Sequence, residues 1–136
     1  MTRALGNINE KGELSMQDTG SILTSIKKLL GITEDYTVFD TDLVIHINSV
    51  FLTLSQLGVG PKEGFAITSK DETWGDYMNS GALLNAIKSY IYLKVRLLFD
   101  PPSSSSVSDS MRNMISELEW RINVEGENSM EESDNV

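Results

Sequence analysis

Four segments of the chain carry apolar side chains three or four residues apart, the spacing that places them on one face of a helix. This periodicity predicts helices over residues 21–30, 40–57, 81–99 and about 108–124. Ser21 is expected to cap the first helix, and Asp40 or Thr41 the second. The third segment is apolar almost all round, which is typical of a central, buried helix, and it ends at Asp100-Pro101-Pro102 because proline cannot continue a helix.

The stretch between the second and third predicted helices breaks this pattern. Its helix-breaking residues are Gly58, Gly60, Pro61, Gly64 and Gly75. Within it, Phe65-Ala66-Ile67-Thr68 alternates in the way that favours a strand. The expected fold class is therefore mainly α, a four-helix bundle-like domain with a short β-hairpin or strand in the loop between the second and third long helices.

Both ends of the chain lack helical periodicity. Residues 1–18 mix glycine with polar side chains and are expected to form a flexible N-terminal arm, with a short strand or helix that orders on a partner as the alternative. Residues 125–136 are polar and acidic and are expected to form a disordered tail. The helical domain then spans residues 19–124.

Composition excludes several classes of function. The chain has 136 residues, 40% of them apolar, which suits one domain with a substantial core. Because it has no cysteine, disulfides, thiolate metal sites and a cysteine nucleophile are excluded. No apolar run approaches the ~18 residues of a membrane span, and the polar N-terminus lacks the apolar core of a secretory signal. We therefore expect no membrane partner and a cytoplasmic location.

The net charge of −9 is concentrated at one end of the chain. Residues 125–136 hold five acidic side chains and no basic one, whereas residues 19–124 hold twelve acidic and nine basic side chains. Broad binding to nucleic-acid phosphates requires clustered lysine and arginine, so this binding mode is not expected of a single chain. In a ring of subunits, a few basic side chains from each copy could still line one surface.

No catalytic or cofactor motif is evident in the sequence. The single histidine, His46, lies in the second predicted helix with no second ligand at helical spacing, so a structural role is favoured. The glycines at 58, 60 and 64 lack the spacing of a phosphate-binding loop, and a turn is favoured there. We expect no cofactor and no metal ion.

A cluster of acidic and aromatic residues occurs in the irregular stretch: Asp71, Glu72, Trp74, Asp76 and Tyr77. The aromatic pair could anchor the loop to its own domain or to a neighbour, or form a contact surface for a partner. The carboxylates could instead hold a hard cation or act as an acid–base pair.

Trp120 lies outside the apolar stripe of the last predicted helix, beside the favourable i,i+4 pair of Glu117 and Arg121. A large aromatic side chain in this position is expected to be covered by another part of the structure, either the irregular loop or an adjacent subunit. The candidate interaction residues are therefore Asp71, Glu72, Trp74, Asp76, Tyr77, Trp120 and Arg121.

Three blocks of the sequence together resemble a known family. They are SKDETWGDY at residues 69–77, IKSYIYLKVRLLFDPP at residues 87–102 and ELEWRIN at residues 117–123. In this order they resemble the head–tail connector proteins, also called adaptor or head-completion proteins, of long-tailed bacteriophages. The resemblance covers about residues 20–124 and leaves out the arm and the acidic tail.

The resemblance implies a virion structural protein and not an enzyme. It implies a ring of subunits, dodecameric in the virion, beneath the portal vertex, extending a channel through which DNA passes without specific binding. The implied partners are further copies of the chain, the portal protein, and the next head-closure or tail connector protein. The implied location is the host cytoplasm during assembly and then the head–tail interface of the virion.

Two other functions remain open on the sequence. A small helical regulatory or adaptor module could bind a host protein through Trp74 and Trp120. A hydrolase could use Asp71, Glu72 and Asp76, with an activity that depends on a metal ion.

Overall fold

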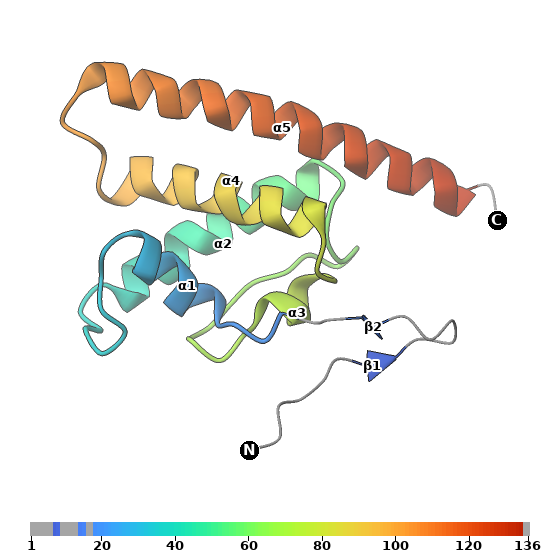
Figure 1. Ribbon diagram of the computed structural model, residues 1–136, viewed down its shortest axis with the longest axis horizontal. Coiled ribbons are helices and arrows are strands. Elements are labelled where there is room, and N and C mark those ends of the chain that lie inside the picture. The colour runs from blue at the N-terminus through green and yellow to red at the C-terminus, as the bar shows by residue number, and fades with distance from the viewer. Residues whose placement is uncertain (1–6, 9–13, 16–17, 135–136) are drawn as a thin grey trace.

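The computed structural model describes residues 7–8, 14–15 and 18–134. Within these residues the chain forms five helices and one pair of very short strands (Figure 1). In chain order the elements are β1 (Asn7–Ile8), β2 (Leu14–Ser15), α1 (Ile22–Leu29), α2 (Asp40–Gln56), α3 (Trp74–Tyr77), α4 (Ala82–Phe99) and α5 (Ser105–Asp134). The two strands are antiparallel, and the predicted mainly helical class is confirmed.

Helix α4 is the centre of the structure. It packs against α1, α2 and α5, and Figure 1 shows it between α5 on one side and α1 with the start of α2 on the other. Its side chains Ile87, Tyr90, Ile91 and Val95 are fully buried, as the apolar character of the segment predicts. The surrounding helices turn their apolar stripes toward it, which leaves their opposite faces available for other contacts.

The start of α2 differs from the prediction. Ser21 caps α1 as expected, because its side chain accepts a hydrogen bond from the Thr24 amide. Neither Asp40 nor Thr41 caps α2, however; Phe39 occupies the cap position and Asp40 is the first helical residue. The Asp40 carboxylate instead lies 2.9 Å from the ammonium of Lys27, a buried side chain of α1. A buried charge requires a counter-ion more strongly than a helix end requires a cap.

The predicted strand or hairpin in the loop between α2 and α4 is absent, although all of residues 57–81 are described. Asn48 of α2 accepts a hydrogen bond from the Ile67 amide at 2.8 Å and donates one to the Ile67 carbonyl at 2.9 Å. These two bonds satisfy both backbone groups of Ile67, within the predicted strand. The stretch therefore follows α2 as an irregular loop.

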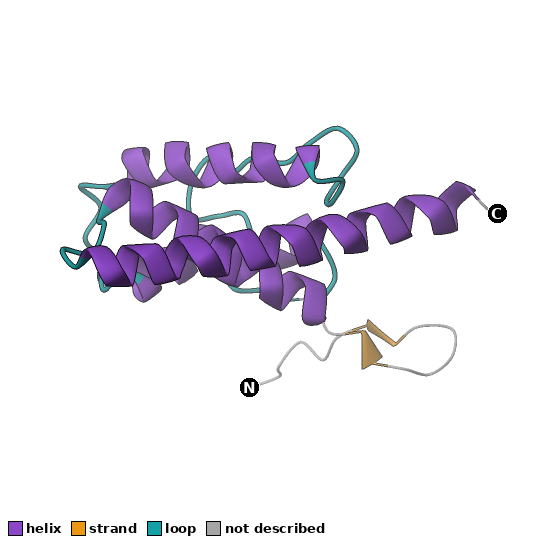
Figure 2. Ribbon diagram, turned by 90° about the horizontal axis from the view of Figure 1, so that it is seen from above, coloured by secondary structure: helices purple, strands orange, loops and turns teal. Residues whose placement is uncertain are grey.

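Helix α5 is longer at both ends than the periodicity predicts. It begins at Ser105 and continues to Asp134, so it includes residues 125–134, for which the sequence predicted a disordered tail. Gly126 is buried against the end of α2, where an added Cβ would lie only 2.6 Å from the Leu57 carbonyl oxygen. Because this glycine allows a close approach, α5 crosses the end of α2 and continues past the other helices (Figure 2).

Most of the predicted N-terminal arm lies outside the described residues. At its end, Asp18 accepts a hydrogen bond from the Gly75 amide through its backbone carbonyl and pairs with the Lys88 ammonium through its carboxylate. Partial burial opposes the charge of Asp18, but the bonds from Lys88 and the Gly20 amide outweigh it and lower its pKa. Asp18 thus ties the beginning of the domain to α3 and α4.

Candidate functional site

The structure divides the seven predicted interaction residues among three environments. Trp74 and Tyr77 lie in the core, and the three carboxylates lie in the loop around α3. Trp120 and Arg121 lie on the exposed side of α5. These residues therefore do not form one surface.

Trp74 anchors the loop to its own domain. The side chain is only 1% exposed, and its indole nitrogen donates a hydrogen bond to the Ser25 hydroxyl at 3.1 Å. The Lys88 ammonium lies 5.2 Å from the centre of the ring, within the range of a cation–π contact. Trp74 therefore holds the loop against α1 and α4 and offers no surface to a partner.

Tyr77 fills the space between the loop and α2. Its ring centre lies 4.8 Å from that of Phe51 and 5.1 Å from that of Phe65. At Gly60, where φ is 92°, an added Cβ would come within 2.8 Å of the Tyr77 ring. The hydroxyl is buried with no hydrogen-bond partner among the described residues, and burial raises the pKa of Tyr77 well above its usual value.

Two of the three loop carboxylates hold the loop in shape. Glu72 accepts hydrogen bonds from the Thr68 amide at 2.8 Å and the Ser69 amide at 3.1 Å. Partial burial raises the pKa of Glu72, but the bonds from Thr68 and Ser69 outweigh it, so the net shift is downward. Asp76 and Thr73 form a capping box, in which the carboxylate accepts from the Thr73 amide at 2.8 Å. Asp71 is exposed.

Neither a metal cluster nor a membrane helix occurs in the part of the chain that the structure describes. No group of three or more histidine, aspartate or glutamate side chains there could hold a metal ion. No helix there is both long enough and apolar enough to cross a bilayer. Several large apolar side chains on the helices are exposed, among them Ile45, Leu52, Met114 and Trp120.

Trp120 is the most prominent of these exposed side chains. It is 68% exposed, although tryptophan is usually well buried. The buried side of α5 is marked by Ile115 and Ile122, and Trp120 lies two residues before Ile122, which is ~200° round the helix. It thus points away from its own core, and the loop does not cover it. Beside it, the Arg121 guanidinium lies 2.7 Å from the Glu117 carboxylate.

The outer face of α2 is a second candidate that the sequence analysis missed. Ile45 and Leu52, one heptad apart, are 61% and 62% exposed. From Leu43 to Gln56 the helix contains no aspartate, glutamate, lysine or arginine, and charged residues are depleted at the centres of protein interfaces. The absence of charged residues from this part of an amphipathic helix is the sequence signal that could have indicated the exposed apolar face.

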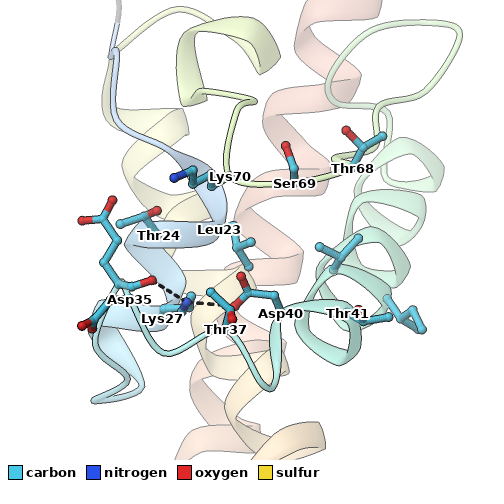
Figure 3. A pocket seen from close by; sticks show the side chains of 13 residues that line it. Leu23, Thr24, Lys27, Asp35, Thr37, Asp40, Thr41, Thr68, Ser69 and Lys70 are labelled. Atoms are coloured by element: carbon cyan, nitrogen blue, oxygen red, sulfur yellow. Dashed lines mark hydrogen bonds and ion pairs between the residues drawn. The ribbon is translucent and has the colours of Figure 1, made fainter.

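A pocket of about 810 Å³ lies beside this face, between α1, the start of α2 and the loop at residues 68–70 (Figure 3). Its apolar wall is formed by Leu23, Val44 and Ile45. The Lys27 ammonium donates to the Glu34 carbonyl at 3.0 Å and pairs with Asp40, which fixes the connection between α1 and α2. The other side chains at the pocket are Thr24, Glu34, Asp35, Thr37, Thr41, Thr68, Ser69 and Lys70. We call this hollow the α1–α2 pocket.

Comparison with known proteins identifies the family. The family model described as "Phage connector protein" matches residues 22–129, which is 108 of the 136 residues. The match begins at the first residue of α1 and extends into α5, so it includes the whole of α1–α4. Neither a curated protein nor a solved structure matches the chain significantly. With most of its length matched, and with the helical core and exposed helix faces described above, the chain belongs to the phage connector protein family.

Proposed function

We propose that the protein is a head–tail connector subunit. Copies of the chain form a ring beneath the portal vertex, extend the DNA channel and provide the docking platform for the next head-closure or tail protein. The family match over residues 22–129 is the observation that carries this proposal. The role is structural, and the subunit acts at the head–tail interface of the virion after assembly in the host cytoplasm.

The distribution of exposed apolar side chains supports assembly into a ring. Ile45 and Leu52 lie on α2, whereas Trp120 lies on α5, and both helices pack on α4. A subunit with two different contact faces associates head to tail, and such a chain of subunits forms a ring when the rotation closes.

The charge of the chain supports passage of DNA without binding. The net charge is −9, and nonspecific affinity for DNA comes from lysine and arginine side chains that neutralise phosphates. A channel built from such subunits repels the phosphate backbone, so the DNA does not adhere to the wall.

Assembly with the portal protein tests the proposal. The purified chain is mixed with the portal protein of the same phage and examined by negative-stain electron microscopy, with the portal protein alone as the control. We expect an additional ring on one end of the portal. A one-to-one complex with a host protein, with no ring alone or on the portal, would instead favour a regulatory module.

A further inference from the structure

We infer that Trp120 of one subunit inserts into the α1–α2 pocket of the next copy of the chain. The inference rests on the proposed function, because it assigns the contact between neighbouring subunits of the ring. Four features carry it: the exposure of Trp120, the size and lining of the pocket, the charges around both, and their positions in the subunit.

The exposure of Trp120 leaves a large apolar surface without a cover. A buried tryptophan removes ~150–250 Å² from water, and tryptophan is enriched among the residues that dominate binding energy at interfaces. Trp120 contributes little of this in the separate subunit, where it is 68% exposed. It is therefore an anchor that requires a partner.

The α1–α2 pocket is large enough to admit an indole and has suitable chemistry. Its volume of about 810 Å³ lies within the range of ~300–1,000 Å³ typical of pockets for small molecules. Leu23, Val44 and Ile45 offer an apolar wall for the ring. The hydroxyls of Thr37 and Thr41 lie beside this wall and are acceptors for the indole N–H.

The charges around the two surfaces are complementary. Trp120 is flanked on α5 by Arg121 and Glu117, whose ion pair is exposed and thus contributes little to subunit stability. The residues that line the pocket include two exposed acids, Glu34 and Asp35, and one exposed base, Lys70. Figure 3 shows Asp35 and Lys70. Arg121 can therefore pair with Glu34 or Asp35, and Glu117 with Lys70. An acidic chain that docks on this rim through arginine avoids like-charge repulsion at the contact.

The positions of the two surfaces fit a repeated contact. Figure 1 shows α5 along one side of α4, and α1 with the start of α2 along the other. When Trp120 of one copy occupies the pocket of the next, each end of the pair still has one surface free. Subunits therefore continue to add until the ring closes.

Fluorescence quenching tests the burial of Trp120 directly. The chain has two tryptophans, and Trp74 is 1% exposed, so iodide quenches mainly Trp120 in the separate subunit. In assembled rings, formed alone or on the portal protein, we expect the quenching constant to fall several-fold. Rings in which Trp120 is quenched as strongly as in the subunit would overturn the inference and leave the proposed function intact.

Substitution of the anchor gives an independent measurement. Trp120→Ala removes an exposed side chain, so the fold is retained, which circular dichroism checks. We expect the concentration at half-assembly to rise at least ~10-fold. Met114→Ala is the matched control, because Met114 is 51% exposed on the same helix but lies six residues away and ~240° round it. Equal effects of the two substitutions would contradict an anchor at Trp120.

A mixing experiment tests the pairing of the two surfaces. Ile45→Glu places a charge in the pocket wall at an exposed position, while leaving Trp120 intact. At the concentration at which half of the wild-type chain is assembled, neither this variant nor Trp120→Ala is expected to form rings alone. Mixed together, they retain one intact anchor and one intact pocket, so we expect a one-to-one dimer by sedimentation velocity.

The results separate failure of the inference from failure of the proposed function. If the wild-type chain forms rings but the mixed variants remain single subunits, the contact lies elsewhere in a genuine connector. If the wild-type chain forms no ring alone or on the portal, both proposals are wrong.

Discussion

Two buried tyrosines show how one hydrogen bond changes the contribution of a side chain to the free energy of unfolding. The Tyr90 hydroxyl donates to the Glu119 carboxylate at 3.0 Å, whereas the buried Tyr77 hydroxyl has no partner among the described residues. We expect Tyr77→Phe to leave the free energy of unfolding unchanged or to raise it by up to ~1 kcal/mol, and Tyr90→Phe to lower it by ~1–2 kcal/mol. Urea denaturation measures both, and an equal loss in the two variants would mean that Tyr77 also has a partner.

The same tyrosines predict a loss of stability at alkaline pH. Burial raises the pKa of Tyr77, and burial together with Glu119 raises that of Tyr90, both above the usual value of 10. Above this pH the unfolded chain releases protons that the folded chain retains, so the free energy of unfolding falls as pH rises. Below pH 10 the contribution is fully present. Urea denaturation at increasing pH is expected to show this fall, with a smaller slope in Tyr77→Phe; an unchanged slope would contradict the prediction.

The ion pair of Lys27 and Asp40 gives a third prediction at single residues. Lys27 is buried, so Asp40→Asn leaves its charge without a counter-ion. We expect the free energy of unfolding to fall by ~2–3 kcal/mol, below the ~3–5 kcal/mol of a fully buried pair because Asp40 is partly exposed. Asp42→Asn is the control in the same helical turn, with an expected loss of at most ~1 kcal/mol from the helix dipole. Similar losses in both would show that Lys27 does not depend on Asp40.

At the level of elements, the sequence predicted the features that are determined by residues close together in the chain. The apolar periodicity located α1, α2 and α4 to within about one residue, because a helical stripe and its stop signals are local. The errors depend on partners distant in the chain. The Asn48 side chain forms hydrogen bonds with the backbone of Ile67, 19 residues later, where the sequence predicted a strand. The Asp40 carboxylate pairs with Lys27 and does not cap α2.

The close approach at Gly126 predicts an unusual response to alanine. Alanine is the better helix former by ~1 kcal/mol, so in an isolated helix Gly126→Ala would stabilise α5. Here its Cβ would lie 2.6 Å from the Leu57 carbonyl oxygen, and an overpacked contact costs ~1–3 kcal/mol. We expect a net fall of ~1 kcal/mol in the free energy of unfolding, measured by urea denaturation with circular dichroism. A net rise would show that α5 does not rest on the end of α2.

The candidate site depends on the whole molecule and was therefore only partly predictable. Trp74 and Trp120 both stand out in the sequence, yet one is 1% and the other 68% exposed. The exposure of Trp120 agrees with its position outside the apolar stripe of α5, which is a local pattern. The burial of Trp74 depends instead on how the loop packs against α1 and α4, and no local pattern encodes this. The α1–α2 pocket likewise joins residues from α1, α2 and the loop at 68–70, so no single segment signals it.

The charge of the whole chain predicts how its self-association responds to salt. Copies with a net charge of −9 repel one another, and salt screens this repulsion over ~10 Å at 0.1 M. We expect the association constant to rise several-fold between about 50 and about 500 mM NaCl, because exposed ion pairs such as those of Arg121 contribute little. Replacing Glu127, Glu131 and Glu132 by Gln and Asp134 by Asn reduces the negative charge from −9 to −5, and should strengthen association at low salt and reduce the salt response. Sedimentation equilibrium measures both effects. Association that weakens with salt would mean that opposite charges, and not apolar contacts, hold the subunits together.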